Sequence, residues 1–359
     1  MTIKKFVRPE VLNLPTINVP ASESGAIRLN ANEAPESLWK DEDKYSLNRY
    51  PSPRPQNLIN ELAAFYDISN DQISISRGST EAIDIIMRTF CIPYKDEILI
   101  SPPTFDMYKF FANANSIKTN EMPLCESEDF CLDINKLTKN FNDKTKIIFI
   151  SSPNNPTGTV VSNTDIEYLL KSVKNKAIVV LDEAYIEFSE LKTMTAKINT
   201  YENLIILRTL SKAYALAGVR CGAIIANSEI SEFIKKILPP FCFATPTIEL
   251  IKNSITPENI DNAKAQINLI KKEKERVSKE LNKSTIVNKV FQSEGNFLLV
   301  KFNDINKLKS ILENTNIVIG FLKYPSLSKF SRITIGTREE NDTLPVSYTH
   351  LTLPTNREV

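Results

Sequence analysis

The sequence predicts an α/β protein in which a larger domain with a mostly parallel, helix-flanked sheet precedes a smaller α+β domain. From about Gln72 to Ala226, short apolar runs alternate with helically spaced stretches, a pattern typical of βαβ units. Beyond a long charged helix expected at Asp261–Lys283, strand patterns recur at Asn296–Phe302 and Ser331–Gly336. A chain of 359 residues has room for two such domains.

Four segments are expected along the chain. Residues 1–35 are rich in proline and turn residues, so we interpret them as an N-terminal arm rather than a core element. Residues 36–245 would form the large domain, and residues 246–344 the small domain that packs with the arm. Residues 345–359 interrupt the pattern of a final helix with two prolines. This favours a non-native tail, with a genuine short tail as the alternative.

The expected elements of the large domain begin with a helix at Leu58–Tyr66. A second helix is expected at Ile83–Phe90, and apolar runs predict strands at Glu97–Ile100, Lys146–Ser151, Ala177–Leu181 and Leu204–Leu207, with a returning strand at Val219–Ala226. On the long helix, one apolar stripe is formed by Ile267, Ile270, Val277 and Leu281. The mixed charges of Lys271–Arg276 then indicate a solvated face.

Composition argues against several classes of protein. Charged residues make up 24% of the chain and the formal net charge is +1, so no electrostatic footprint for nucleic acid or a membrane surface is expected. Neither an apolar span near 18 residues nor a secretory leader is evident. Reduced thiols are expected because the cysteines lack paired spacing, and together these features predict a cytoplasmic protein. The cysteines are Cys91, Cys125, Cys131, Cys221 and Cys242.

The histidine count restricts the chemistry further. The only histidine is His350, which lies in the expected tail. Ser–His–Asp triads, Cys–His pairs and histidine-rich zinc sites are therefore not expected, and no metal is predicted. An enzyme built from this chain would carry protons on a lysine, a tyrosine or a carboxylate.

Three polar segments begin where the expected strands end. They are Ser152–Gly158 (SPNNPTG), Asp182–Tyr185 (DEAY), and Ser211–Lys212 with Arg220 eight residues later. Loops at the carboxyl ends of parallel strands converge on one crevice, where ligands bind. An amide, a carboxylate, a phenol, an amine and a guanidinium would therefore meet there. This set suits pyridoxal 5′-phosphate.

Lys212 is the predicted catalytic lysine. Pyridoxal phosphate chemistry needs an amine that forms a Schiff base and then moves a proton between the substrate Cα and the cofactor C4′. Lys212 follows a buried strand and precedes the apolar stretch Ala213–Ala217, which favours its neutral form. A Ser–Lys pair alone carries little weight because most lysines lie on the surface. Its position beside the other two segments supports the assignment.

The other strand ends supply groups for the cofactor ring. Asp182 would keep the pyridine nitrogen protonated, with a helix N-cap as the alternative. Tyr185 and Asn155 are placed to hydrogen-bond the cofactor O3′, although Asn-Pro with Gly is also a generic turn signal. Phe105, after the strand Glu97–Ile100, is placed to stack on the ring; a core aromatic is the alternative.

The cofactor phosphate needs backbone donors and a cation. Ser79 and Thr80 precede a helical pattern, so their amides would point from a helix N-terminus, although an ordinary cap explains this as well. Arg220 can supply bidentate charge pairing and Ser211 a hydroxyl.

At this level of detail the chain resembles the histidinol-phosphate aminotransferases, which are fold-type-I pyridoxal-phosphate enzymes. The resemblance runs from about Leu14 to Leu344 and is carried by LNANE (Leu29–Glu33), RYP (Arg49–Pro51), SPNNPTG, DEAYIEF (Asp182–Phe188), LRTLSKAYALAG with VRCG (Leu207–Gly222) and RITIGTREE (Arg332–Glu340). It implies a homodimer with active sites at the subunit interface. It also implies transfer of an amino group between histidinol phosphate and 2-oxoglutarate in histidine synthesis.

The resemblance also implies roles for residues that local patterns do not mark. Tyr50 would reach the cofactor phosphate from the partner subunit. Arg332 would bind the carboxylate of the glutamate donor, with Asn32 close by. From its local pattern alone, Arg332 is an arginine that opens a strand, for which a surface salt bridge is the default.

Two departures from the family pattern leave the substrate open. The family's tyrosine near Ile17 and its arginine around Ile319–Gly320 are not evident here, and Lys323, Tyr324 or Lys329 are the candidates to compensate. The alternatives are therefore a related aminotransferase for aromatic or other amino acids, or a decarboxylase of a phosphorylated amino acid. A catalytically silent protein on the same scaffold is the non-enzyme alternative.

Overall fold

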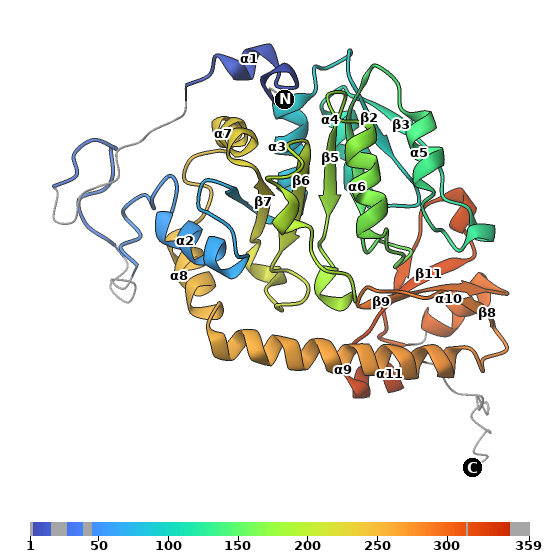
Figure 1. The fold of residues 1–359 in the computed structure, drawn as a ribbon. Coiled ribbons are helices and arrows are strands. Elements are labelled where there is room, and N and C mark those ends of the chain that lie inside the picture. The colour runs from blue at the N-terminus through green and yellow to red at the C-terminus, as the bar shows by residue number, and fades with distance from the viewer. Residues whose placement is uncertain (1–2, 16–26, 39–44, 314, 345–359) are drawn as a thin grey trace.

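The structure, a computed structural model, describes residues 3–15, 27–38, 45–313 and 315–344. A seven-stranded sheet, here called the central sheet, forms the middle of the molecule in the order β1-β7-β6-β5-β4-β2-β3 (Figure 1). Its strands are β1 (Ile73–Ser76), β2 (Glu97–Ile100), β3 (Lys118–Glu121), β4 (Thr145–Ser151), β5 (Ile178–Asp182), β6 (Leu204–Thr209) and β7 (Gly222–Ala226).

The central sheet is parallel except at one strand. Strands β6, β5, β4, β2 and β3 pair in parallel, whereas β7 is antiparallel to both β6 and β1. In register, Ser151 lies beside Asp182, and Asp182 beside Leu207. The carboxyl ends of β4, β5 and β6 therefore lie at one edge of the sheet. The prediction of a mostly parallel sheet is confirmed.

Helices cover both faces of the central sheet, since alternate strand residues point to opposite sides. Ile147 and Phe149 of β4 belong to one apolar core, and Ile148 and Ile150 to the other. The first core is closed by α3 (Gly78–Phe90), α4 (Met107–Ala114) and α7 (Ser228–Ile237). The second is closed by α2 (Gln56–Phe65), α5 (Ile134–Asn140), α6 (Asn163–Ser172) and α8 (Thr245–Ser254).

The N-terminal segment differs from its expected place outside the core. The short helices η1 (Ile3–Lys5) and α1 (Pro9–Leu12) pack on the side of the sheet covered by α3 and α7. Four apolar side chains of these helices and of the turn between them are buried. They are Ile3, Phe6, Val7 and Val11. Within the predicted arm of residues 1–35, the stretch from η1 to α1 therefore contributes to the core, and the limits of the arm stay a prediction. The prediction rested on proline and turn residues, and it did not consider the apolar side chains of this stretch.

A second sheet lies at the C-terminal end of the chain and is called the C-terminal sheet here. Its strands run in the order β10-β11-β9-β8 and pair antiparallel. They are β8 (Val287–Val290), β9 (Phe297–Phe302), β10 (Gly320–Phe321) and β11 (Phe330–Thr334). With α10 (Ile305–Glu313) and the end of α9, this sheet encloses a separate apolar core around Val300 and Phe302.

Helix α9 (Pro257–Leu281) runs beneath both sheets (Figure 1). It starts four residues before the expected position because the Thr256 side chain accepts a hydrogen bond from the Asn259 backbone and Pro257 occupies the first turn. From the predicted apolar stripe, Ile267, Val277 and Leu281 are buried. The helix thereby supplies contacts to both parts of the molecule.

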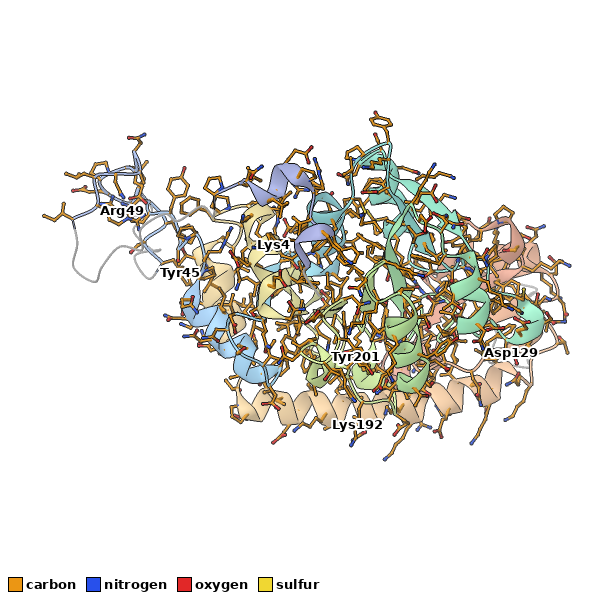
Figure 2. All side chains as sticks on the ribbon, turned by 45° about the horizontal axis from the view of Figure 1, so that its top comes forward. Lys4, Tyr45, Arg49, Asp129, Lys192 and Tyr201 are labelled. Atoms are coloured by element: carbon orange, nitrogen blue, oxygen red, sulfur yellow. The ribbon has the colours of Figure 1, made fainter. Side chains whose placement is uncertain are left out.

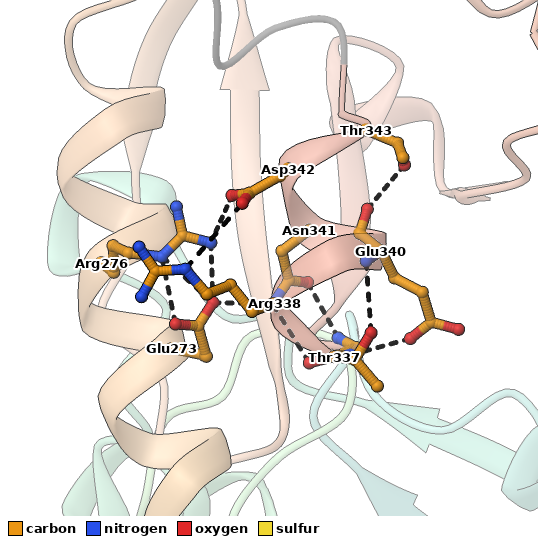
Figure 3. A network of polar contacts seen from close by, with 9 residues as sticks. Glu273, Arg276, Thr337, Arg338, Glu340, Asn341, Asp342 and Thr343 are labelled. Carbon is orange, nitrogen blue, oxygen red and sulfur yellow. Dashed lines mark hydrogen bonds and ion pairs between the residues drawn. The ribbon is translucent and has the colours of Figure 1, made fainter.

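The last described helix, α11 (Arg338–Asp342), is tied to α9 by polar contacts (Figure 3). Thr337 and Glu340 form a reciprocal capping box at its start. Asn341 is buried, accepts the Gly336 N–H and donates to Glu273 of α9. These bonds fix the chain just beyond β11. None of the helices in the described ranges combines the length and apolar character needed to cross a bilayer.

Candidate active site

A cavity of about 210 Å³ opens at the edge where β4, β5 and β6 end. Every predicted site residue except Tyr50 and Asn32 lines it. The lining consists of Gly78, Ser79, Thr80, Phe105, Ser151, Asn155, Asp182, Ala184, Tyr185, Thr209, Ser211, Lys212, Arg220 and Arg332. Groups from distant parts of the sequence thus meet in one pocket, as the strand-end pattern predicts.

Lys212 lies three residues beyond the end of β6. Its Nζ is 5.6 Å from the centre of the Tyr185 ring. The surrounding protein lowers the pKa of Lys212 chiefly by burial, and further through the positive charges of Arg332 and Arg220, against an opposing effect of Asp182. The side chain still reaches solvent through the open cavity. A larger fraction of this amine is therefore neutral, and able to attack an aldehyde, than of an ordinary lysine.

Asp182 is the last residue of β5 and is 3% exposed. Its Oδ1 accepts the Ala184 N–H at 3.1 Å, and its Oδ2 accepts the Tyr108 hydroxyl at 2.7 Å. Burial raises the pKa of Asp182, while these two donors and Lys212 oppose the rise. The helix-cap alternative does not hold, because the next helical turn, η4 (Ile186–Phe188), has Tyr185 and not Asp182 at its N-cap position.

Tyr108 is a site residue that the sequence did not reveal. It lies on α4, is fully buried, and reaches Asp182 from outside the cavity lining. Its spacing after Phe105 resembles an ordinary apolar position of a core helix. Only the three-dimensional contact with Asp182 distinguishes it.

Tyr185 and Phe297 bring the two sheets together at the cavity. Burial raises the pKa of Tyr185 to about 12, so its phenol stays protonated and can donate a hydrogen bond at neutral pH. Its ring meets that of Phe297, on β9, edge-on at 5.2 Å. The phenol is thus held on the cavity wall by the C-terminal sheet.

Arg332 reaches the cavity from β11 of the C-terminal sheet. Its Nη1 donates to Oδ1 of Asn155, and its guanidinium lies 5.7 Å from the centre of the Phe297 ring. Because Oδ1 of Asn155 accepts from Arg332, the amide NH₂ of Asn155 remains as the donor group. This arrangement replaces the surface salt bridge that the local sequence pattern suggests for Arg332.

The other wall of the cavity carries the features of an anion site. Helix α3 begins at Gly78, so Ser79 and Thr80 form its first turn, where backbone N–H groups lack helical partners. Arg220 lies against this turn and donates to Ser211 Oγ at 3.4 Å. Gly78 has φ +79°, and a Cβ there would lie 2.9 Å from the Arg220 guanidinium. The glycine therefore allows the cation to approach the helix start.

Tyr50 and Asn32 do not line the cavity of their own chain. Tyr50 is 53% exposed and its ring lies 5.0 Å from that of Phe241. A Glu33 carboxylate bound by Arg28 and Arg49 holds this segment. Figure 2 places Arg49 at one end of the molecule, far from Asp129 at the other.

The residues proposed to compensate for the departures are also outside the cavity lining. Lys323 and Lys329 are exposed, and Tyr324 donates its hydroxyl to the Thr104 carbonyl at 3.0 Å. Gly320 pairs with Arg332 across β10 and β11. The departure near Ile17 lies outside the described residues, as does the tail at 345–359.

With this geometry in place, comparison with known proteins is decisive. A family model described as aminotransferase class I and II matches residues 11–345. The chain belongs to this family. The aminotransferase is also 39% identical to a histidinol-phosphate aminotransferase of Francisella philomiragia, over 89% of this chain and 87% of the relative. That similarity places it among the histidinol-phosphate aminotransferases, as its motifs indicate.

Solved structures agree with this family and its fold. The histidinol-phosphate aminotransferase of Clostridium acetobutylicum is 26% identical and superposes with a TM-score of 0.74, covering 84% of this chain and 90% of that one. The enzyme of Sinorhizobium meliloti, solved in complex with pyridoxal-5′-phosphate, is 20% identical with a TM-score of 0.75, covering 83% and 81%. The second likeness bears on the fold alone. The predicted fold class is confirmed.

Proposed function

We propose that this aminotransferase uses pyridoxal 5′-phosphate to move an amino group between histidinol phosphate and 2-oxoglutarate, a step of histidine biosynthesis. The observation that carries the proposal is the cavity in which Lys212, Asp182 and the start of α3 face one another. Membership of the family supports the transfer of an amino group. The names of the relatives supply histidinol phosphate as one substrate, and the motif resemblance implies 2-oxoglutarate as the other.

The residues present fit the cofactor chemically. Gly78 leaves a cradle beside Arg220 that a Cβ would fill, and this cradle suits a phosphate. At the opposite end, the buried Asp182 carboxylate suits a protonated pyridine nitrogen. Lys212 would attach the aldehyde, while Asn155 and Tyr185 would donate to O3′ and Phe105 would cover the ring. When bound, the cofactor supplies an electron sink and carries the amino group.

The chain's own side chains then have distinct roles in the reaction. Lys212 Nζ would take the proton from the substrate Cα and deliver it to the cofactor C4′, which its lowered pKa favours at neutral pH. Arg332 binds the carboxylate of glutamate, the amino donor in the biosynthetic direction, through its planar guanidinium. Arg332 also donates a hydrogen bond to Asn155. Binding of the amino-donor substrate at Arg332 would therefore affect the position of the Asn155 amide.

One observation favours a second candidate, the aminotransferase for aromatic or other amino acids or the related decarboxylase. In the described part of the chain, the cations lining the cavity are Lys212, Arg220 and Arg332. With Arg220 assigned to the cofactor phosphate, Arg332 alone would serve a second phosphate. The resemblance places another arginine near Ile319–Gly320, where this chain has none.

A substrate comparison separates these candidates. We expect the purified enzyme to turn over histidinol phosphate with a kcat/KM at least about tenfold above that for phenylalanine, because a charged phosphate contact is lost with the latter. Steady-state rates with 2-oxoglutarate as acceptor measure this. A preference for phenylalanine would reverse the choice between the candidates.

The cofactor attachment is tested at Lys212. We expect Lys212→Ala to abolish the borohydride-trapped label and to lower kcat by about 10²- to 10⁴-fold, the range contributed by a general acid–base group. Lys235→Ala is the matched control, since burial also lowers the pKa of Lys235 but this residue lies outside the cavity lining. Peptide mapping that places the label on another lysine would contradict the assignment. A protein with no visible absorbance band after addition of the cofactor would support the silent alternative.

We also propose that the protein is a cytoplasmic homodimer in which Tyr50 serves the cavity of the other subunit. The exposure of Tyr50 and its absence from its own cavity support this arrangement. Sedimentation velocity tests the assembly, and a fully active monomer would contradict it.

A further inference from the structure

We propose that Tyr108 is a positioning residue, whose hydroxyl keeps the Asp182 carboxylate ionised and fixed in the orientation that receives the cofactor ring nitrogen. The inference rests on the proposed function, because it concerns a group that binds at the cavity. It assigns a role to a residue that does not line this cavity.

The placement of Tyr108 suits a residue that acts through another. The tyrosine lies on α4 outside the cavity lining, and its side chain is fully buried. Its ring stacks on Phe149 of β4 at 4.8 Å and 18° between planes. It meets Phe105 edge-on at 5.7 Å. These contacts hold the ring so that the hydroxyl reaches Asp182 Oδ2 at 2.7 Å.

The direction of the proton in this bond follows from the surroundings. Burial and the neighbouring Asp182 charge raise the pKa of Tyr108 well above its ordinary value, so the phenol remains protonated. A protonated phenol next to a carboxylate donates to it, and such charge-assisted bonds are stronger than neutral ones. Tyr108 is therefore a permanent donor to Asp182.

Of the three groups that offset the burial of Asp182, which are Tyr108, the Ala184 N–H and the Lys212 charge, Tyr108 has the largest effect on its pKa. Its other hydrogen bond comes from the Ala184 N–H, at Oδ1. Burial alone would favour the protonated, neutral carboxyl. Loss of the Tyr108 hydroxyl removes one of two protein donors and frees the carboxylate to rotate. The acceptor for a protonated ring nitrogen is then weaker.

The contact also connects two functions of one short segment. Phe105 lines the cavity and is proposed to cover the cofactor ring, while Tyr108, three residues later, holds the carboxylate at the ring's edge. The edge-on contact between the two aromatic rings fixes their relative positions. The segment at the start of α4 would therefore position both the residue that covers the face of the cofactor ring and the carboxylate that receives its nitrogen.

The variant Tyr108→Phe isolates the hydroxyl, since it keeps the ring that packs on Phe149. We expect it to weaken equilibrium binding of pyridoxal 5′-phosphate by about tenfold, the order of one hydrogen bond to a charged group. Binding of the 1-deaza analogue, in which a C–H replaces the ring nitrogen, should be unchanged. The ratio of the two dissociation constants therefore reports the ring-nitrogen contact and does not depend on catalysis.

Tyr201→Phe is the matched control. Tyr201 also donates its hydroxyl to a carboxylate, Glu167 Oε2 at 2.8 Å, but it does not line the cavity. Neither dissociation constant should change in this variant. Any change there would report a general effect of removing a tyrosine hydroxyl.

Three outcomes contradict the inference while leaving the proposed function intact. The first is unchanged cofactor binding in Tyr108→Phe. The second is equal weakening of cofactor binding and of analogue binding in that variant. The third is weaker cofactor binding in the double variant Tyr108→Phe, Asp182→Asn than in Asp182→Asn alone. The last test applies because a residue acting through Asp182 has no effect once that carboxylate is gone. Failure of the unmodified protein to bind the cofactor would instead contradict the proposed function.

Discussion

Burial acts in opposite directions on Lys212 and Asp182, although both face the same cavity. It lowers the pKa of the amine and raises that of the carboxyl, since each neutral form is favoured away from water. Neighbouring groups also shift the two pKa values, by charge at Lys212 and mainly by hydrogen bonds at Asp182. Arg332 and Arg220 push the Lys212 pKa further down, whereas Tyr108 and the Ala184 N–H hold Asp182 toward its ionised form. The result suits an amine that attacks and a carboxylate that stays charged.

This account predicts how attachment at Lys212 depends on pH. Because its pKa is lowered from 10.5, the neutral amine is present at lower pH than for a free lysine. Arg220→Met removes one positive neighbour, so the pKa should rise toward 10.5 and the rate profile for attachment of pyridoxal should move to higher pH. Pyridoxal without phosphate is the probe, because Arg220 is also proposed to bind the phosphate. Stopped-flow absorbance across the pH range measures the shift.

Two further variants control this experiment. Arg77→Met removes a cation that pairs with Glu81 and does not line the cavity, and it should leave the profile in place. Asp182→Asn removes the charge that raises the Lys212 pKa, so the profile should move to lower pH. Equal displacement by Arg220→Met and Arg77→Met would contradict a specific effect of Arg220.

Single residues were predictable from sequence where a strand end or a motif marked them. Asp182, Lys212 and Asn155 follow apolar runs, and the topology then brings them together. Tyr108 lacks such a mark, because one turn after Phe105 an aromatic residue is typical of a core helix. Its partner lies 74 positions away. A contact at that separation depends on how α4 packs on the central sheet, where the Tyr108 ring stacks on Phe149 of β4, and local spacing does not specify this.

Among the elements, the turn that carries Asn155 depends on the close approach of its backbone at Gly158 to the backbone of residues 293–294. Gly158 has φ +77°, and a Cβ there would lie 2.6 Å from the Cα of Ser293. The Gly158 carbonyl also accepts the Glu294 N–H at 2.8 Å. Residues 293–295, which precede β9, are thereby fixed on the turn. Lys274 of α9 donates to the carbonyls of Ser293 and Gly295, which holds them from the other side.

We expect Gly158→Ala to lower the free energy of unfolding by at least about 1–2 kcal/mol, the cost of a left-handed backbone for a residue with a Cβ. The clash with Ser293 would add to this cost. The added Cβ would meet the Cα and Cβ of Ser293, which cannot move away without a shift of the backbone. Gly218→Ala is the control, since a Cβ at Gly218 would meet nothing within 4 Å. Urea denaturation of both variants measures the difference. Equal stability of the two would contradict the argument.

The elements themselves were more predictable than their boundaries. Buried strands such as β4 and β5 contain uninterrupted apolar runs, Ile147–Ile150 and Ile178–Leu181, so their positions follow directly from the sequence. Helix α9 begins earlier than its charged pattern suggests because the Thr256 cap and Pro257 set its start. The N-terminal helices were not expected, since four-residue helices such as α1 take their stability from tertiary burial.

At the scale of the whole molecule, the cavity lies between two sheets with separate cores. Asp182 ends β5 of the central sheet, Lys212 lies in the loop after β6 of the same sheet, and Arg332 lies on β11 of the C-terminal sheet. A small apolar cluster that includes Tyr185, Ala213 and Phe297 connects them beside the cavity. The site is therefore complete only when both parts are folded and in contact. The sequence indicated two domains, but their limits at residues 245 and 246 stay a prediction.

This arrangement predicts how the cofactor changes unfolding. A ligand that binds only the folded protein stabilises it by an amount set by its concentration, about 4 kcal/mol at 1,000 times the dissociation constant. Because contacts from both sheets surround the cavity, we expect one thermal transition that moves upward as a unit when pyridoxal 5′-phosphate is added. Differential scanning calorimetry, with Lys212→Ala as the control that loses covalent attachment, measures this shift. The control should move less, because its cofactor is held only by non-covalent contacts. Two transitions, with only the lower or only the upper one displaced, would show that the sheets unfold independently and would contradict the coupling of Arg332 to the rest of the site.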